Sequence, residues 1–258
     1  MKLQHPIVLV HGLGATSRFP FMDYFQGLAR HLRRGGHRVV LANLSPWQTI
    51  EHRAAQLREQ LEREIPKGRQ RRGHRFNLVA HSLGGLDSRY LISALDYGDR
   101  ITSLTTIGTT HRGTHLADLV QTRPLPHVLR AIDRLLAPFG ATAKALAQVT
   151  TRFCRGELAA RTPNHRDVAY FSAITVIGRP IIKNSLPVFW LPHNLLHRAE
   201  GDNDGFVSAQ SAAWGEVICR DYGDHYAQIG QFGRVRTGRH DHLPLYDRIV
   251  KRLVRAGF

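Results

Sequence analysis

The chain has 258 residues, 42% of them hydrophobic, and two cysteines. This length can bury one large core, so we expect a single domain, and two cysteines are too few for a disulfide-stapled fold. With 36 Lys and Arg against 20 Asp and Glu, the formal net charge is +16, which attracts polyanions such as nucleic acid or anionic lipid surfaces.

The amino terminus reads MKLQHPIVLVHG. Its apolar run is too short for the core of a signal peptide, so we interpret it as the first buried strand. We therefore expect a cytoplasmic protein, although a secreted form that has lost its leader would look the same. No stretch approaches the roughly 18 apolar residues that a membrane span needs.

Short apolar runs alternate with amphipathic stretches as far as residue 178. The predicted strands are residues 6–12, 37–44, 76–82, 101–109 and 168–178. The predicted helices lie within residues 21–36, 49–66 and 83–98. This alternation predicts an α/β fold with a mostly parallel central sheet and helices on both faces. Ligands in such sheets bind beyond the carboxyl ends of the strands.

The densest basic run is PKGRQRRGHR, residues 66–75, directly before the predicted strand at 76–82. It has no interleaved aromatic residues and no nucleic-acid-binding motif. We interpret it as a solvated loop at the amino end of that strand, and we do not expect nucleic acid as a partner.

Residues 112–165 break the alternation. This segment is helical in pattern, with apolar positions such as Val128, Leu129, Ile132 and Leu135, and it is longer than a crossover between strands requires. The pattern fits a cap over the site and fits two packed core helices equally well. We predict one domain over residues 1–258 with a cap or lid insertion at about 112–165.

The segment AHSLG, residues 80–84, lies where a predicted strand meets a predicted helix. It is a variant of the Gly-x-Ser-x-Gly nucleophile elbow with Ala80 in the first glycine position. A small residue before the corner and Gly84 after it let the strand turn directly into the helix. We interpret Ser82 as a catalytic nucleophile rather than as a plain helix N-cap.

Acylation of a serine requires N–H donors for the oxyanion. The backbone N–H of Leu83, at the start of the helix, is one candidate. A second should come from the loop after an early strand, and Leu13 follows the strand end His11-Gly12. A phosphate-binding loop is excluded, because neither Gly-x-Gly-x-x-Gly nor Gly-Lys-Ser/Thr occurs in the chain.

A serine nucleophile also needs a histidine that accepts its proton and a carboxylate that orients the histidine. In the polar loop EGDNDGFVS, Asp204 is the first candidate acid and Asp202 the second. For the histidine, His225 follows Asp204, whereas His240 and His242 lie in GRHDHLPLYDRIV, where they precede a further predicted helix at the end of the chain. The residue pattern alone leaves the choice of histidine open.

Four stretches of the chain stand out as a set. They are PIVLVHGLG at 6–14, NLVAHSLGGLDSRYL at 77–91, LTTIGTTHRGTHLADLV at 104–120 and NDGFV at 203–207. Together they resemble the bacterial triacylglycerol lipases and their esterase relatives in the α/β-hydrolase superfamily. The resemblance implies an α/β-hydrolase fold in which Asp204 is the acid and His225 is the base.

The same resemblance implies a serine carboxylester hydrolase, a lipase or esterase that forms an acyl-enzyme on Ser82. The cap and the apolar segment 185–196 would line an acyl pocket, so medium to long chain acylglycerols are the expected substrates. An acyltransferase or a phospholipase could use the same three residues. A catalytically silent binding protein on this fold is the alternative that is not an enzyme.

Two departures from the family bear on metals and export. Several relatives bind a structural Ca²⁺ through an aspartate two residues after the histidine, and that position is Ala227 here. We therefore expect no metal and no cofactor. The relatives are largely secreted, whereas this chain begins without a leader. The expected partners are an ester or lipid substrate and, from the charge, anionic lipid surfaces.

Overall fold

A parallel sheet forms the centre of the molecule in the computed structural model, which describes residues 2–14, 23–67, 73–122, 144–178, 180, 185–231 and 241–258. Its strands are β1 (Ile7–Val10), β2 (Val39–Leu41), β3 (Phe76–His81), β4 (Ile101–Ile107), β5 (Ala169–Val176) and β6 (Glu216–Tyr222). They lie in the order β2-β1-β3-β4-β5-β6, and every neighbouring pair is parallel. The predicted α/β fold is confirmed.

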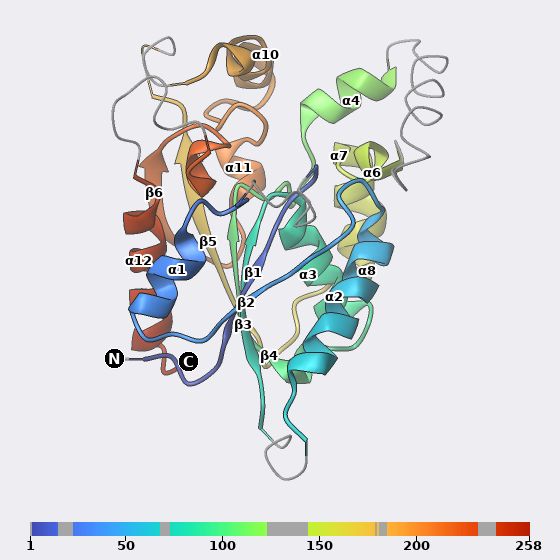
Figure 1. Cartoon of the computed structure of the whole chain (residues 1–258). Coiled ribbons are helices and arrows are strands. Elements are labelled where there is room, and N and C mark those ends of the chain that lie inside the picture. The colour runs from blue at the N-terminus through green and yellow to red at the C-terminus, as the bar shows by residue number, and fades with distance from the viewer. Residues whose placement is uncertain are drawn as a thin grey trace.

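Helices cover both faces of this sheet (Figure 1). The α-helices are α1 (Leu28–Arg34), α2 (Ile50–Glu64), α3 (Leu83–Ser93), α4 (His115–Thr122), α6 (Lys144–Ala147), α7 (Thr151–Phe153), α8 (Ala159–Arg161), α10 (Trp190–Glu200), α11 (Ala209–Ala212) and α12 (Leu243–Arg255). Shorter helical turns are Gly98–Arg100, Cys154–Leu158, Pro187–Phe189 and Ala227–Ile229. Helices α1 and α12 cover one face, and α2, α3 and α8 cover the other (Figure 1).

Strand β1 shows how one apolar run fills two cores. Ile7 and Leu9 pack into the core that includes residues of α1 and α12, whereas Val8 and Val10 pack into the core that includes residues of α2 and α3. Successive side chains of a strand point to opposite faces, so a strand covered on both sides must be apolar throughout. The carboxyl ends of the strands then emerge between the two helical layers.

Among the described strands, β6 is the one that the sequence analysis does not predict. Most of its side chains are exposed or half-buried, because it forms the edge of the sheet beside β5. Its charged residues pair with α12: Glu216 with Arg252 and Asp221 with Arg248. Edge strands carry charged residues that discourage pairing with other chains, and this hides the apolar alternation.

The segment 112–165 has two parts in the described residues. Helix α4 lies above the carboxyl edge of the sheet (Figure 1), whereas Cys154 and Leu158 are buried in the same core as α2 and α3. The second part therefore contributes to the core rather than to a cap. Residues 123–143, which hold the predicted apolar positions, lie outside the described residues. Cys154 and Cys219 are both free thiols.

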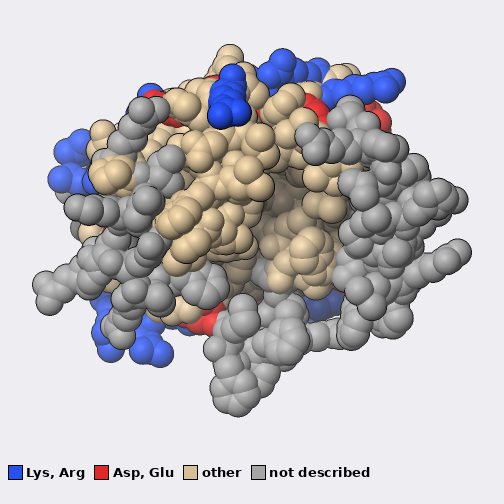
Figure 2. All heavy atoms as spheres, turned by 90° about the horizontal axis from the view of Figure 1, so that it is seen from above, with Lys and Arg blue, Asp and Glu red and all other residues tan. Residues whose placement is uncertain are grey.

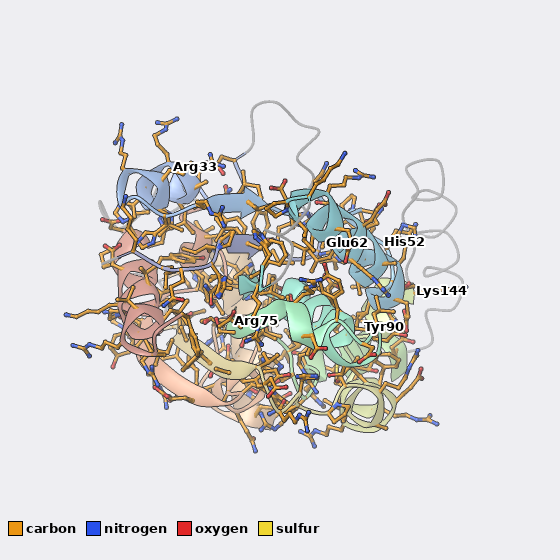
Figure 3. The ribbon with its side chains drawn as sticks, turned by 90° about the horizontal axis from the view of Figure 1, so that it is seen from below. Arg33, His52, Glu62, Arg75, Tyr90 and Lys144 are labelled. Carbon is orange, nitrogen blue, oxygen red and sulfur yellow. The ribbon has the colours of Figure 1, made fainter. Side chains whose placement is uncertain are left out.

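The amino ends of the strands form the opposite edge of the molecule. Arg75, which lies near the middle of the view from below (Figure 3), donates to the carbonyl groups of Ile101 (2.8 Å) and Asp167 (3.1 Å). This arginine of the basic run at 66–75 therefore ties β3 to the starts of β4 and β5. Residues 68–72 of that run lie outside the described residues.

Candidate active site

Ser82 occupies the corner between β3 and α3. Its backbone has φ 55° and ψ −130°, a conformation that residues other than glycine adopt rarely and at an energetic cost. Two hydrogen bonds hold it: its N–H donates to the Ile107 carbonyl and its own carbonyl accepts from Thr109 Oγ1, each at 2.9 Å. The corner therefore has the strained geometry of a nucleophile elbow.

Glycines let the loop after β1 approach this corner closely. A Cβ on Gly84 would lie 2.6 Å from a backbone carbonyl oxygen of β1, and a Cβ on Gly12 would lie 2.7 Å from Ser82 Cβ. A side chain at either position would push the loop and the corner apart. Leu13 and Leu83, the expected oxyanion donors, line the same pocket as Ser82.

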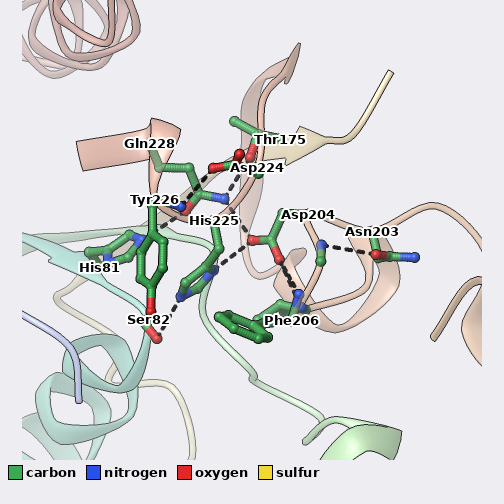
Figure 4. Close-up of polar contacts among 12 residues, drawn as sticks. His81, Ser82, Thr175, Asn203, Asp204, Phe206, Asp224, His225, Tyr226 and Gln228 are labelled. Carbon is green, nitrogen blue, oxygen red and sulfur yellow. Dashed lines mark hydrogen bonds and ion pairs between the residues drawn. The ribbon is translucent and has the colours of Figure 1, made fainter. Parts of the chain in front are cut away.

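The structure brings the side chains of Ser82, Asp204 and His225 together (Figure 4). His225 Nε2 lies 3.0 Å from Ser82 Oγ, and His225 Nδ1 lies 2.8 Å from Asp204 Oδ2. Asp204 is 1% exposed and His225 is 5% exposed. An imidazole that donates Nδ1–H to a carboxylate presents a basic Nε2 to the serine, which is what general-base activation of a hydroxyl requires.

The Asp204 carboxylate accepts four hydrogen bonds. Oδ1 accepts from the N–H groups of Phe206 (3.0 Å) and Val207 (2.8 Å), and Oδ2 accepts from His225 and from Gln228 Nε2 (2.6 Å). Four donors match the acceptor capacity of an ionised carboxylate. These four donors therefore fix the orientation of this group.

Buried polar side chains continue behind His225. Gln228 Oε1 accepts from His81 Nε2 (2.9 Å), and His81 Nδ1 accepts from Tyr24 OH (2.7 Å). The ring centroids of His81 and His225 are 4.6 Å apart. Burial lowers the pKa of His81 well below its usual value, so this imidazole is neutral.

A buried ion pair holds the loop that carries Leu13. Arg53 of α2 donates through Nε to Asp87 Oδ2 of α3 at 2.8 Å, and both side chains are 0% exposed. The same guanidinium donates to the carbonyl groups of His11 and Ser45, each at 2.7 Å. The Arg53 guanidinium therefore joins α2 to α3 and to the end of β1. This holds the loop that carries Leu13 next to α3, which begins directly after Ser82.

An apolar pocket of about 370 Å³ lies above Ser82, within the usual size range of small-molecule sites. Figure 2 shows a hollow among uncharged residues, with Lys and Arg at the margin of this face. Helix α4 supplies Leu116, Ala117 and Val120 to the pocket lining. Helix α6 supplies Leu146, and Val149 lies two residues after α6.

The segment 185–196 does not supply lining residues among those described for this pocket, contrary to our expectation. Phe189 is instead 0% exposed and packs against Phe206 and Tyr226, with ring centroids 4.9 Å and 5.3 Å away. Phe206 and Tyr226 do line the pocket, so Phe189 supports the wall from behind. Phe189 is therefore a core residue and not part of the pocket surface.

The other candidate acids and bases lie elsewhere. Asp202 is exposed and forms an ion pair with Arg220. His242 lies directly before α12, and its Nε2 donates to the Phe25 carbonyl at 3.2 Å. His240 lies outside the described residues.

The position of the calcium aspartate of some relatives is a buried alanine, Ala227, whose N–H donates to Asp224 Oδ1 at 2.8 Å. In the part of the chain that the structure describes, one group of side chains lies close enough to share an ion: Asp99, His165 and Asp167. Both carboxylates are exposed, and the group lies at the amino ends of β4 and β5, away from Ser82. We assign no role to it.

Sequence reasoning missed Arg53 and Gln228. Arg53 falls on the apolar face of α2, between Ile50 and Leu57, and a charged residue at such a position is itself a signal of a buried partner. Gln228 lies three residues after His225, but it reaches Asp204 only because Ala227–Ile229 forms a helical turn. No local pattern reveals that turn.

Comparisons with known proteins show what the chain is similar to. A family model described as a domain of unknown function, DUF7379, matches residues 2–157. Triacylglycerol lipase 2 of Saccharomyces cerevisiae is 34% identical over 256 residues, which cover 92% of this chain and 75% of that protein. A triacylglycerol lipase of Pseudomonas fragi is 28% identical over 293 residues, covering 100% of this chain and 98% of that protein.

The crystal structure of Staphylococcus hyicus lipase has a TM-score of 0.76 to this chain at 17% identity, covering 98% of this chain and 96% of that one. At this identity the likeness concerns the fold, which is that of the α/β-hydrolases.

Proposed function

The chain belongs to the triacylglycerol lipase family and to the family described as DUF7379, and from this premise we propose that it cleaves medium to long chain acylglycerols through an acyl-enzyme on Ser82. It is a carboxylic ester hydrolase. The observation that carries the proposal is the hydrogen-bonded series from Ser82 Oγ through His225 to Asp204, next to an apolar pocket of about 370 Å³.

In the acylation step, Ser82 Oγ attacks the ester carbonyl carbon while His225 Nε2 accepts the serine proton. The negative charge that develops on the carbonyl oxygen is stabilised by the N–H groups of Leu13 and Leu83. His225, now cationic and stabilised by Asp204, gives its proton to the oxygen of the departing alcohol. The acyl group remains as an ester on Ser82.

In the deacylation step, water takes the place of the alcohol. His225 accepts a proton from this water as it attacks the acyl carbonyl, and the same two N–H groups stabilise the second oxyanion. His225 then returns the proton to Ser82 Oγ as the carboxylic acid departs. The support for this order of steps is the 3.0 Å contact between His225 Nε2 and Ser82 Oγ.

The substrate class follows from the pocket wall. Leu116, Ala117 and Val120 of α4 offer an acyl chain an apolar surface, and burying each methylene of that chain contributes about 0.8 kcal/mol. A longer chain therefore gains more from the pocket until the pocket is full. Relatives described as triacylglycerol lipases support acylglycerols as the natural class.

We propose further that the site faces a lipid surface with anionic headgroups. Exposed apolar side chains lie on α4 and in the segment that contains α10, at the end of the molecule above the strands (Figure 1): Val120, Val188, Leu191 and Leu195. Lys and Arg lie at the margin of the same end (Figure 2). Apolar side chains ringed by cations suit an anionic surface. No described helix is long and apolar enough to cross a membrane.

The test is hydrolysis of p-nitrophenyl esters of increasing acyl length by the wild-type chain and by Ser82→Ala. We expect the rate to rise with chain length and to fall about 10⁶-fold in Ser82→Ala. Covalent labelling of the wild type by a fluorophosphonate, absent in Ser82→Ala, identifies the nucleophile. Wild-type protein that neither hydrolyses any ester of the series nor reacts with the probe contradicts the proposal.

The surface association has its own test. Sedimentation with phosphatidylglycerol vesicles should carry down more protein than sedimentation with phosphatidylcholine vesicles, and Leu191→Ser should reduce the bound fraction while leaving the hydrolysis of a soluble ester unchanged. Equal binding to both lipids, or equal binding by the variant, contradicts the surface that we propose.

A further inference from the structure

Asp204 Oδ2 accepts two hydrogen bonds, from His225 Nδ1 (2.8 Å) and from Gln228 Nε2 (2.6 Å). The same amide nitrogen donates to Thr175 Oγ1 at 2.6 Å, and Gln228 is 2% exposed. A carboxylate oxygen that the histidine needs is thus shared with a residue that is not among the three catalytic side chains (Figure 4).

With His81 neutral, the hydrogen-bond chain behind Gln228 runs in one direction, because Gln228 donates through Nε2 to Asp204 and its Oε1 must then accept from His81. At one end the backbone N–H of Gly12 can only donate, and it donates to Tyr24 OH at 3.0 Å. Tyr24 OH then donates to His81 Nδ1 (2.7 Å), and His81 Nε2–H donates to Gln228 Oε1 (2.9 Å). At the other end the Asp204 carboxylate can only accept. Each proton in the chain therefore has one position.

This direction assigns a role to each member. His81 is the neutral tautomer with its proton on Nε2, and the amide of Gln228 presents its nitrogen to Asp204. Protonation of His81 would make both of its ring nitrogens donors, so the Tyr24 hydroxyl would have to accept from Nδ1 as well as from Gly12.

We propose that Gln228 is a positioning residue for the catalytic carboxylate: its amide holds Asp204 aimed at His225, and joins it through His81 and Tyr24 to the loop that carries Leu13. The inference rests on the proposed function, because Asp204 and His225 act in that reaction. A glutamate at this position would supply an acceptor where Asp204 needs a donor, and would place two carboxylates in contact.

The titratable groups that face His225 come from several elements. They are Asp204 from its loop, His81 from the end of β3, Ser82 from the corner, Asp224 and Tyr226 from its own loop, and Tyr24 behind His81. The Gln228 amide takes part of the negative charge density of Asp204. Without it, that charge stabilises the cationic form of His225 more strongly, so the acid limb of the pH profile moves to higher pH.

The experiment compares Gln228→Met, which keeps the side-chain length and removes all three side-chain hydrogen bonds, with Gln228→Glu, which removes the two that Nε2 donates to Asp204 and Thr175. The matched control is Gln56→Met, because the amide of Gln56 also has both its donor and its acceptor in use, each with Ser45. For Gln228→Met we expect kcat to fall at least about tenfold, since a hydrogen bond to a charged group is lost. KM should be unchanged, because Gln228 does not line the pocket.

The acid limb of kcat against pH should move upward in Gln228→Met, further upward in Gln228→Glu, and not at all in Gln56→Met. The downfield NMR resonance of His225 Nδ1–H should titrate in the same order in the absence of substrate. The proposal is overturned if Gln228→Met has the same kcat and the same His225 titration as the wild type. It is also overturned if kcat in Gln228→Met falls only at temperatures where the variant is partly unfolded. If the wild type cleaves no ester, the proposed function fails, but the NMR order still decides this inference.

Discussion

The floor and the roof of the pocket are built from different interactions. By the floor we mean Ser82 and His225 together with the buried polar side chains behind them, such as Asp204, Gln228 and Arg53, which do not line the pocket. These side chains are held by hydrogen bonds of 2.6 to 2.8 Å to fixed partners. The roof consists of apolar side chains on α4 and α6. Among the described residues, the polar contacts of helix α4 include the hydrogen bond that Thr151 Oγ1 donates to Asp118 at 2.7 Å.

This difference separates two tasks. A hydrogen bond fixes a direction and a proton position, which the chemical step needs, whereas apolar contact fixes only a volume. Damage to the floor should therefore lower kcat for every ester. Damage to the roof should change which ester is preferred and leave the chemistry intact.

The strongest test of the floor is Asp204→Asn. The amide accepts only through its oxygen, so its NH2 group must face either the N–H groups of Phe206 and Val207 or the donors of His225 and Gln228. In the second orientation His225 loses its tautomer, and in both it loses the negative charge that stabilises its cationic form. We expect kcat to fall about 10⁴-fold with a short acyl ester and with a long one alike. Steady-state kinetics with two p-nitrophenyl esters measures this.

The matched control for that variant is Asp202→Asn, the same change two residues earlier on an exposed side chain that pairs with Arg220. It should keep the wild-type rate, since exposed ion pairs contribute about 0 to 1 kcal/mol to stability. A comparable fall in kcat in Asp202→Asn would mean that the loss in Asp204→Asn is not specific to the catalytic acid.

The second test removes the cation under the oxyanion loop. Arg53→Met leaves Asp87 buried without its partner, and the free energy of unfolding should fall by about 3 to 5 kcal/mol. Urea unfolding measures this, with Arg63→Met as the control because Arg63 is an exposed arginine of the same helix paired with Glu59. An equal fall in the free energy of unfolding in the two variants would show that the buried ion pair contributes no more to stability than the exposed one.

The sequence predicts more of the floor than of the roof. Ser82 follows from local chemistry, because a strand, a corner and a helix are each visible in the residues around it. The loop pattern makes Asp204 the first candidate acid, but the choice of His225 over His240 and His242 needs a family resemblance. A contact between residues 21 apart depends on how two loops fold back over the sheet.

Contacts between residues far apart in the chain cannot be predicted from the local residue pattern. Arg53 meets Asp87, and Gln148 of the segment 112–165 meets Glu51 of α2, only in the folded chain. The edge strand β6 was hidden by its own charges. The pocket volume depends on the packing of α4 and α6 against strand-end loops, which no single segment encodes.

The third test concerns pH and acts on the floor. His11, His81 and His111 are buried, and burial lowers the pKa of each, that of His11 to about 4. Below about pH 6.5 the unfolded chain takes up protons at these positions and the folded chain does not. Stability is therefore present above that pH and falls as the pH drops, by about 1.4 kcal/mol per histidine and pH unit.

Urea unfolding at pH 7, 6 and 5 gives this slope. His111→Gln should reduce it by about one histidine's share, whereas the exposed His52→Gln should leave it close to the wild-type value. The same slope in His111→Gln and in the wild type would show that His111 does not enter the folded state as the neutral imidazole.

The mildest test changes the roof alone. Ala117 of α4 is 9% exposed and lines the pocket, so Ala117→Phe should fill part of the volume that a long acyl chain occupies. We expect kcat/KM for a long-chain ester to fall about tenfold relative to a short-chain ester, with kcat for the short ester unchanged. Ala159→Phe, on the exposed side of α8, is the control and should change neither. Equal losses for both esters in Ala117→Phe would mean that the roof, like the floor, positions the reacting groups.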